Sequence, residues 1–422
     1  MIYNIPKPIK IRKIKQVFCK DYIADIPLYI SQAFQASNLP SKIKSGHKIG
    51  ITVGSRGIAN MNIIAKQLIN ELKNIKAEPF ILAAMGSHGG ATSEGQREVL
   101  ASYGITEESM GVTIYSSMET TRIGMIVDKV PVYFSQDALK ADGIIALNRV
   151  KLHTDFESDL ESGMSKVMVI GLGKKDGAES IHSLGIYGLK EILPQAAQLI
   201  INKTPIIQGI GIVENGYDQT MEIEFCTPEN IIQTDKKLLK KCREVFPSLP
   251  TEKIDILIAQ EMGKNISGTG LDTNVIGKLG INGVDDSHKP DISKLIVLDI
   301  TDESHGNALG VGLADVTTRK LVNKINFKDT YANTITSTFL KRAQIPVTAE
   351  TEKEALEIAY KTCWQPDIEK LRLIIVKNTL ELENLLISKA IWDDLQNNKS
   401  IIANGDWEEL SFNENKEIIN RL

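Results

Sequence analysis

Hydrophobic and polar positions in the first half of the chain follow two alternating patterns. Short apolar runs ending near glycine, such as KIGITVG (48–54) and PFILAAMG (79–86), predict buried strands. Each precedes a stretch with apolar residues at three- and four-residue spacing, which predicts an amphipathic helix; these stretches are ANMNIIAKQLINELKNI (59–75) and SEGQREVLASYG (93–104). The strand series continues with VTIYSS (112–117), VPVYF (130–134) and DGIIALNRV (142–150), with the helix SQDALKA (135–141) between the last two. This alternation predicts an α/β fold with a mostly parallel sheet.

The pattern changes near residue 250. The charged helical stretch DKKLLKKCREVFPSLPTEK (235–253) ends in prolines, which predicts a domain boundary there. A second set of elements follows: DILIAQEMG (255–263), KLIVLDIT (294–301), EKEALEIAYKTCW (352–364) and RLIIVKNT (372–379). We therefore predict two α/β lobes with mostly parallel sheets facing a central cleft. Their bounds are 1–250 and 251–394, with the C-terminal tail, about 395–422, packed on the first lobe.

The composition is that of an ordinary soluble globular protein, with 42% hydrophobic and 24% charged residues. A formal charge of −4 gives no long-range attraction for nucleic acid or an anionic membrane. The one basic cluster, KPIKIRKIK (7–15), alternates with Ile and Pro and predicts an edge strand with one solvated face. The four cysteines form no CxxC pair, which fits a reducing compartment. No apolar run approaches the ~20 residues of a spanning helix, so we expect a cytoplasmic protein.

Candidate chemistry gathers in loops that follow strand-like runs. The loops VGSRGI (53–58), MGSHGG (85–90) and NRVKLHTDF (148–156) contain two of the chain's six histidines. Open α/β sheets bind ligands at the carboxyl ends of their strands, and Arg56, His88 and His153 all lie just beyond such ends. Imidazoles on two separate loops suit a general acid and a general base. Alternatively, His88 is a turn residue and His153 is satisfied locally by Thr154 or Asp155.

Two further residues lie in the segment ESGMSK…GKKDGAESIH (161–182). Lys166 is flanked by apolar residues, so its amine is either desolvated and nucleophilic or extended toward water. His182 fits a metal ligand and equally a capping or core histidine. The GLGKK stretch resembles a phosphate loop without the full spacing of one.

The order, spacing and local sequence of these four segments resemble the nickel-pincer-nucleotide lactate racemase family, over essentially the whole chain. The resemblance implies two α/β domains flanking a cleft. It also implies nickel held by pyridinium-3,5-bisthiocarboxylic acid mononucleotide, which is attached to a lysine through a thioamide. Two sulfurs, one carbon and one histidine bind the metal in that family. Enzymes that synthesise this nucleotide are then implied partners.

Mapped by motif, the resemblance implies a role for each candidate residue. His88 and His153 look like the paired acid/base histidines, Lys166 like the attachment lysine, and His182 like the nickel ligand. Arg56 matches the arginine that meets the substrate carboxylate. In the second lobe, the substrate-orienting lysine and its neighbour correspond to Lys264 and Glu261.

Some positions differ from the lactate enzymes. Val53 replaces an acidic residue, Glu261 replaces a glutamine, and the attachment lysine follows Gly163, Met164 and Ser165 in place of a Gly-Gly pair. These differences imply another 2-hydroxy acid, inverted at C2 by a racemase or an epimerase. Transient oxidation to the planar keto acid avoids a dianionic enolate, and inversion in both directions needs two bases.

Two alternatives remain open from the residues alone. One is a zinc-dependent hydrolase or lyase with His88, His153 and His182 as ligands, each about 2.1 Å from the metal. The other is a non-catalytic protein that binds a sugar acid or a nucleotide. The racemase interpretation requires Lys166 near His182, whereas the zinc interpretation gives this lysine no role.

Overall fold

The computed structural model describes residues 5–55, 57–286 and 289–422. Arg56, one of the predicted substrate-binding residues, lies outside these ranges. The chain divides into two compact units. Unit 2 is the continuous segment Cys19–Phe246, and unit 1 combines Met1–Phe18 with Pro247–Leu422. The predicted α/β fold with mostly parallel sheets is confirmed.

Unit 2 is built on a six-stranded sheet in the order β4-β3-β2-β7-β8-β9. All neighbouring pairs are parallel except β8 and β9. Its strands are β2 (Lys48–Val53), β3 (Glu78–Ala83), β4 (Ile114–Tyr115), β7 (Gly143–Arg149), β8 (Ile206–Glu214) and β9 (Thr220–Cys226). Its main helices are α1 (Ile26–Ala36), α3 (Met61–Asn74), α4 (Ser93–Ser102), α8 (Lys174–His182), α10 (Leu193–Lys203) and α11 (Ile231–Val245). Shorter helices are α2 (Leu39–Lys42), α5 (Glu107–Met110), α6 (Gln136–Leu139), α7 (Met164–Lys166) and α9 (Gly185–Tyr187).

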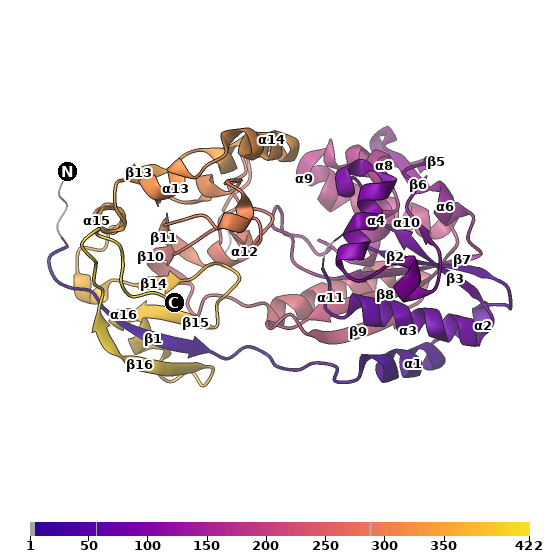
Figure 1. Ribbon diagram of the computed structural model, residues 1–422, viewed down its shortest axis with the longest axis horizontal. Coiled ribbons are helices and arrows are strands. Elements are labelled where there is room, and N and C mark those ends of the chain that lie inside the picture. Colours follow the sequence, from indigo (N-terminus) through magenta and orange to yellow (C-terminus); the bar gives the residue numbers. More distant parts are fainter. Residues whose placement is uncertain (1–4, 56, 287–288) are drawn as a thin grey trace. The chain divides into compact units, whose positions relative to one another are not determined.

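Alternate side chains of each central strand enter different cores, because successive residues of a strand point to opposite faces. On β3, Ile81 and Ala83 join the core formed with α1 and α3, whereas Phe80 and Leu82 join the core formed with α10. Both faces are therefore covered by helices, as Figure 1 shows. This explains why the strands read as continuous apolar runs.

One predicted member of the strand series lies elsewhere. The VPVYF run corresponds to β6 (Pro131–Ser135), which pairs antiparallel with β5 (Thr120–Met125) in a separate two-stranded sheet. The prediction that it continues the parallel series is wrong. An apolar run indicates a strand but does not identify the strand with which it pairs.

Unit 1 contains an eight-stranded sheet in the order β13-β12-β11-β10-β14-β15-β1-β16. The strands from β13 to β14 are parallel, and β15, β1 and β16 pair antiparallel. The strands are β1 (Lys10–Gln16), β10 (Lys253–Ala259), β11 (Asp291–Val297), β12 (Val316–Thr318), β13 (Val347–Ala349), β14 (Leu373–Val376), β15 (Asn384–Ser388) and β16 (Ile401–Glu409). The helices are α12 (Thr273–Ile276), α13 (Arg319–Asn323), α14 (Phe327–Ser337), α15 (Glu352–Thr362) and α16 (Lys389–Leu395).

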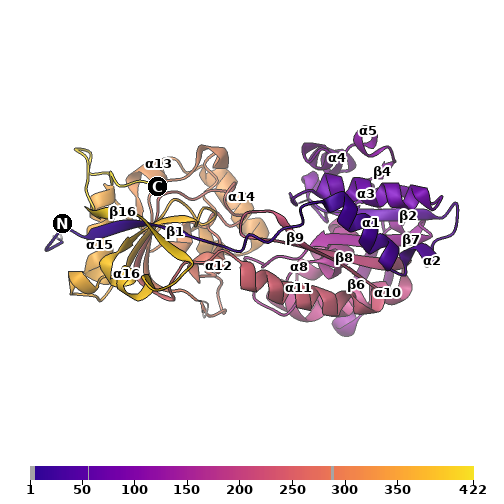
Figure 2. The same ribbon diagram turned by 90° about the horizontal axis from the view of Figure 1, so that it is seen from below.

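The basic N-terminal segment forms β1, but not at the sheet edge. This strand pairs with β15 on one side and β16 on the other, so β16 is the outer strand (Figure 1). Figure 2 shows the indigo β1 among the yellow C-terminal strands. Ile11 and Ile14 are fully buried, and the Arg12 guanidinium lies 4.9 Å from the ring centre of Trp392 and 5.0 Å from that of Trp407. The edge-strand prediction is wrong because the alternation reveals a solvated face without revealing the neighbouring strands.

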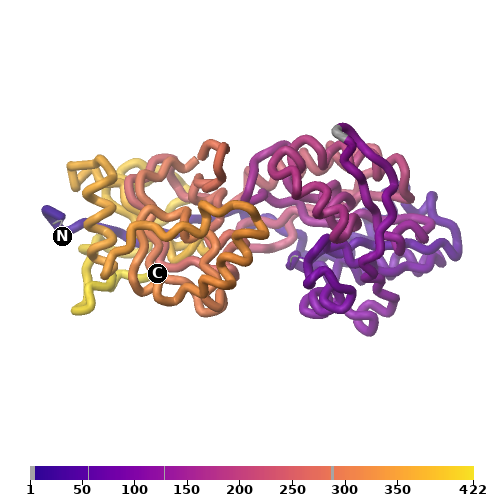
Figure 3. Tube along the Cα trace, turned by 90° about the horizontal axis from the view of Figure 1, so that it is seen from above, coloured from indigo at the N-terminus to yellow at the C-terminus, as the bar shows by residue number. Residues whose placement is uncertain are grey.

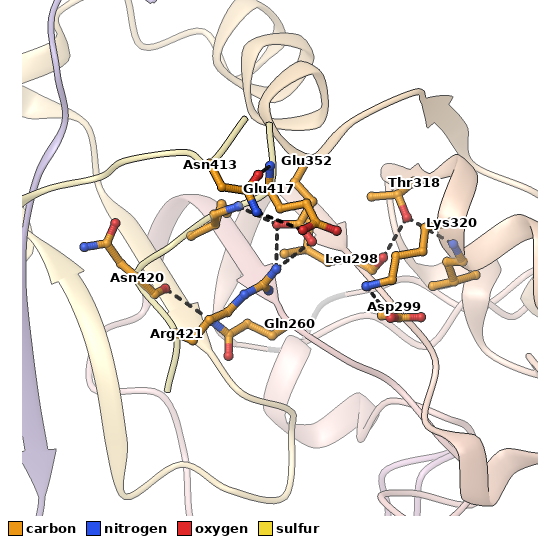
Figure 4. Close-up of polar contacts among 12 residues, drawn as sticks. Gln260, Leu298, Asp299, Thr318, Lys320, Glu352, Asn413, Glu417, Asn420 and Arg421 are labelled. Atoms are coloured by element: carbon orange, nitrogen blue, oxygen red, sulfur yellow. Dashed lines mark hydrogen bonds and ion pairs between the residues drawn. The ribbon is translucent and has the colours of Figure 1, made fainter. Parts of the chain in front are cut away.

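The C-terminal tail packs on unit 1, so its predicted packing on the first lobe is wrong. Arg421 binds the buried carboxylate of Glu352 on α15, with distances of 2.7 and 2.8 Å to its two oxygens. Gln260 donates to the carbonyl of Asn420 (Figure 4). In Figure 3 the indigo strand β1 and the yellow tail lie in the same unit. Residues 5–18 likewise belong to unit 1 rather than to the predicted 1–250 lobe.

No helix among the described residues combines the length and apolar character that crossing a membrane requires.

Candidate active site

The candidate residues of unit 2 follow the strands at the centre of its sheet. From β2 the chain builds β3 and β4 on one side, while β7, β8 and β9 lie on the other. The strand order therefore reverses between β2 and β7, where ligands bind in open α/β sheets. The loop holding Arg56 follows β2, and the loop holding His153 follows β7. His88 follows β3, the other neighbour of β2.

His88 lies exposed at the start of a 3₁₀ turn, η1 (Gly89–Ala91). Gly89 has φ 66°, and a Cβ there would come within 2.6 Å of the backbone of Gly95. The glycine therefore lets this loop pack tightly against the first turn of α4. The histidine side chain remains at the solvent-facing end of the sheet.

A buried lysine is hydrogen-bonded to the residues that hold the His88 loop. Lys174 is 2% exposed, and its ammonium donates to the carbonyl of Ala83 (2.6 Å) and to the side-chain oxygen of Gln96 (3.1 Å). Gln96 in turn donates to the carbonyls of Gly86 and His88. Burial lowers the pKa of Lys174 to about 8. The GLGKK stretch thus uses this lysine inside the fold, not as a phosphate ligand.

His153 is held mainly by its own loop. Its Nδ1 accepts a hydrogen bond from the backbone N–H of Asp155 at 3.1 Å and lies 3.8 Å from that residue's carboxylate. Its ring packs against Phe156 with centroids 4.7 Å apart. The alternative prediction, that Asp155 satisfies His153 locally, therefore holds for Nδ1.

The backbone of this loop is fixed by the buried carboxylate of Glu161. Its oxygens accept from the N–H of His153 (2.7 Å) and of Ser158 (3.0 Å), and Arg243 of α11 forms an ion pair with it. Burial raises the pKa of Glu161, opposed by these hydrogen bonds and by Arg243. The sequence interpretation missed both residues of this ion pair.

Lys166 ends α7 and is followed by a π-helical segment, η3 (Val167–Gly171), a rare form that often occurs at functional sites. The helix starts after Gly163, whose φ is 95°. The buried carboxylate of Asp235 accepts from the N–H groups of Met164 (2.9 Å) and Ser165 (2.7 Å). Asp235 was also missed, although it lies on the buried side of α11 together with Leu238 and Leu239.

His182 ends α8 and is accessible to solvent. The surrounding protein atoms nevertheless lower its pKa by desolvation, the charge of Lys166 lowers it further, and the carboxylate of Asp155 raises it. The Lys166 amine and the Asp155 carboxylate of the His153 loop thus both act electrostatically on the His182 ring. The location of Lys166 beside a nickel-ligating His182 stays a prediction of the racemase interpretation.

The described residues contain no group of three or more His, Cys, Asp or Glu side chains that could hold a metal ion. His88, His153 and His182 are all described, so the three-ligand zinc site is not formed. A metal that takes a single histidine from the protein needs no such cluster.

A second charged contact lies at the same end of the unit 2 sheet. Arg149, at the end of β7, pairs with Glu214 at the end of β8. The other oxygen of Glu214 accepts from the N–H of Ala59 at 2.6 Å. A residue that follows β2 is thus hydrogen-bonded to the end of β8, which lies on the other side of the strand-order reversal.

Unit 1 places its candidate residues at its own strand-order reversal. Glu261 and Lys264 follow β10, which lies between β11 and β14. Glu261 accepts from Asn378 (2.9 Å), a residue that follows β14. Lys264 donates to the carbonyl of Gly268 and to Asn333 of α14 (2.9 Å).

Comparisons with known proteins bear on the family and the fold of the chain. Residues 9–190 match the family model of the lactate racemase N-terminal domain. The lactate racemase apoprotein from Thermoanaerobacterium thermosaccharolyticum has a similar structure at 15% identity, with a TM-score of 0.54 over 88% of this chain and 99% of that one. A Thermotoga maritima protein of known crystal structure is similar at 11% identity, with a TM-score of 0.51 over 85% and 96% of the two chains. No curated protein sequence matches significantly.

Proposed function

The chain is a member of the lactate-racemase-like family, and we propose that it is a racemase or epimerase that inverts C2 of a 2-hydroxy acid. The observation that carries the proposal is that the His153 loop and the start of the Lys166 helix lie at the same end of β7, where Asn148 donates to the carbonyl of Gly163 at 2.9 Å. A site for inversion needs acid/base groups beside a redox group, and this neighbourhood supplies the protein side of both.

The residues present fit a nickel-pincer nucleotide attached at Lys166. The charge of the Lys166 amine acts on the accessible imidazole of His182, and a metal held mainly by a nucleotide needs only one such protein ligand. In this proposal Lys166 would hold the nucleotide and His182 would ligate its nickel. When bound, the group would supply the redox chemistry for inversion at C2.

The two histidines move the hydroxyl proton. A ring nitrogen that takes up this proton must first be unprotonated, so the ring's own proton must lie on the other nitrogen. At His153 the Asp155 N–H, 3.1 Å from Nδ1, occupies the lone pair of that nitrogen and places the proton of the neutral ring on Nε2. Uptake of the hydroxyl proton by His153 therefore requires this contact to open, and the Asp155 carboxylate, 3.8 Å from Nδ1, would then stabilise the doubly protonated ring. His88, on a separate loop, serves the opposite enantiomer.

The substrate carboxylate is assigned to two cations. Arg56 follows β2, where a planar guanidinium suits bidentate contact with a carboxylate. In unit 1, Lys264 has hydrogen bonds to Gly268 and Asn333 that fix its ammonium group, and Glu261 accompanies it. An acid at position 261 favours a substrate with a further hydroxyl donor over lactate.

Protein from two expression hosts tests the proposal. A host that makes the pincer nucleotide is expected to yield a mass adduct on the Lys166 peptide and inversion of a 2-hydroxy acid, followed by chiral chromatography. Protein from an ordinary host is expected to carry no adduct and show no inversion. Full inversion by protein with unmodified Lys166 and no nickel would exclude this mechanism.

A further inference from the structure

We propose that helix α11 (Ile231–Val245) positions the attachment lysine and an acid/base histidine relative to one another, with Asp235 fixing the Lys166 helix and Arg243 fixing His153 through Glu161. The inference rests on the proposed function for the roles of Lys166 and His153. The contacts themselves belong to unit 2 alone. Asp235, Arg243 and Glu161 act through the backbone segments that they hold, so we describe them as positioning residues.

The first contact defines where the Lys166 helix begins. Asp235 is 1% exposed and accepts the N–H groups of Met164 and Ser165, the two residues directly before the lysine. Two backbone donors on one carboxylate fix the helix start both along and around its axis. Gly163 makes this approach possible, because a Cβ there would lie 2.2 Å from an oxygen of Asp235.

The second contact fixes the His153 loop. One guanidinium nitrogen of Arg243 donates to the carbonyl of Ser158 (2.6 Å) and to the carboxylate of Glu161. The side chain of Glu161 is 1% exposed and holds the N–H of His153. Removing the arginine would leave a buried carboxylate without its counter-ion, which is costly in a protein interior.

Because Asp235 and Arg243 lie on one helix, α11 fixes the distance between the two segments that they hold. Asp235 and Arg243 lie eight residues apart on one helix, which corresponds to about 12 Å along its axis. A rigid element of this kind transmits the spacing between the two segments that it holds. Since a displacement of ~1 Å in a catalytic group can reduce the rate 10²-fold, this separation affects the chemistry without any contact with the reactants.

The same helix supplies matched controls. Lys236 pairs with Asp159 of the His153 loop at 3.5 Å, and Lys237 pairs with Glu224 of β9 at 2.8 Å. Both lysines are substantially exposed, so these ion pairs contribute little to stability. Replacing either lysine changes the charge of α11 without disturbing its two buried contacts.

Hydrogen–deuterium exchange of the full, unloaded chain tests the two contacts without any enzymatic assay. Asp235→Asn is expected to accelerate exchange of the amides at 164–166 about tenfold and leave 151–162 unchanged. Arg243→Lys is expected to accelerate exchange in 151–162 and leave 164–166 unchanged, because a single ammonium does not reproduce the guanidinium geometry. Lys237→Ala, whose ion pair lies outside both segments, should change neither. Uniformly faster exchange across unit 2, or variants indistinguishable from Lys237→Ala, would overturn the positioning role.

The loaded protein supplies the second readout. Asp235→Asn is expected to lower the fraction of Lys166 that carries the adduct about tenfold, and Arg243→Lys to lower kcat about 10²-fold with little change in KM and full adduct. Normal adduct fraction in Asp235→Asn, or normal kcat in Arg243→Lys, would contradict the inference. Absence of both adduct and inversion in the parent protein would instead refute the proposed function and leave the exchange result standing.

Discussion

The two units follow the same topological rule but treat their candidate residues differently. In both, candidate residues follow strands at or beside the point where the strand order reverses: β2, β3 and β7 in unit 2, and β10 in unit 1. In unit 2, a buried carboxylate holds the backbone of the His153 loop, and the His153 ring accepts a hydrogen bond from within that loop. In unit 1, side chains from other segments hold the candidate side chains, Asn378 that of Glu261 and Asn333 that of Lys264.

This difference separates two tasks. A group that transfers a proton or carries a covalent adduct needs a fixed backbone and a reactive side-chain end. A group that recognises a substrate benefits from having the side chain itself pre-oriented by neighbours. The described candidate residues of unit 2 therefore have the organisation expected for chemistry, and those of unit 1 the organisation expected for recognition.

Lys166→Arg provides the strongest test of unit 2. The variant keeps the positive charge but cannot form the thioamide, so we expect complete loss of the adduct and of inversion. The matched control is Lys175→Ala, an exposed lysine of α8 that pairs with Glu179 at 3.7 Å. Intact-mass spectrometry and chiral assay measure both. An active Lys166→Arg variant would remove the chemical role of this residue.

Replacing either acid/base histidine should have the next largest effect. His88→Ala and His153→Ala are each expected to reduce turnover by ~10²–10⁴-fold with little change in thermal stability. His47, whose Nδ1 accepts from the N–H of Lys44, is a histidine of the same unit away from the strand-order reversal, and His47→Ala should be neutral. If one of the first two variants kept near-normal turnover, that histidine would be a turn residue only.

A smaller effect is expected in unit 1. Lys264→Ala should raise KM roughly 10- to 100-fold with a lesser effect on kcat, because it removes a charge-assisted contact to the substrate. Lys328→Ala, an exposed lysine of α14, serves as the control. A fall in kcat with unchanged KM would assign chemistry to unit 1 and abolish the separation of tasks. Arg56→Lys, in the loop after β2, is likewise expected to raise KM, because a point charge does not replace a bidentate fork at a carboxylate.

The smallest effect concerns stability and pH. Burial raises the pKa of Asp235 to about 7 from 3.8, so the folded protein holds this proton more tightly than the unfolded chain between those values. The Asp235 contribution to the free energy of unfolding is therefore present at low pH and is lost as the pH rises toward 7. Asp235→Asn lacks this dependence.

Thermal unfolding of the wild type and Asp235→Asn between pH 5 and 8 measures this contribution. The stability advantage of the wild type should shrink with rising pH and become constant above the folded-state pKa. Glu161 also has a raised pKa, but it is present in both proteins and cancels from the difference. The stability of Lys236→Ala should change with pH in the same way as that of the wild type. A pH-independent difference for Asp235→Asn would show that this carboxylate is ionised throughout.

The sequence predicts well the features encoded by neighbouring residues. The helix at 59–75 is found as α3 (Met61–Asn74), and the apolar runs before the three loops are β2, β3 and β7. Features that depend on distant partners were missed. The buried pair Glu161–Arg243 joins residues 82 positions apart, and Asp235 meets Met164 over 71 positions. A charge in a helical pattern gives no sign of such a partner, because its periodicity describes only its own helix.

The position of β1 inside the unit 1 sheet has a consequence for synthesis of the chain. This strand is synthesised before its partners β15 (Asn384–Ser388) and β16 (Ile401–Glu409), which follow on the order of tens of seconds later at ordinary elongation rates. All of unit 2 (Cys19–Phe246) is made in the interval. An apolar strand left unpaired for so long would invite aggregation with other nascent chains. Lys10, Arg12, Lys13 and Lys15 give the waiting strand a strong positive charge, which keeps it soluble until its neighbours emerge.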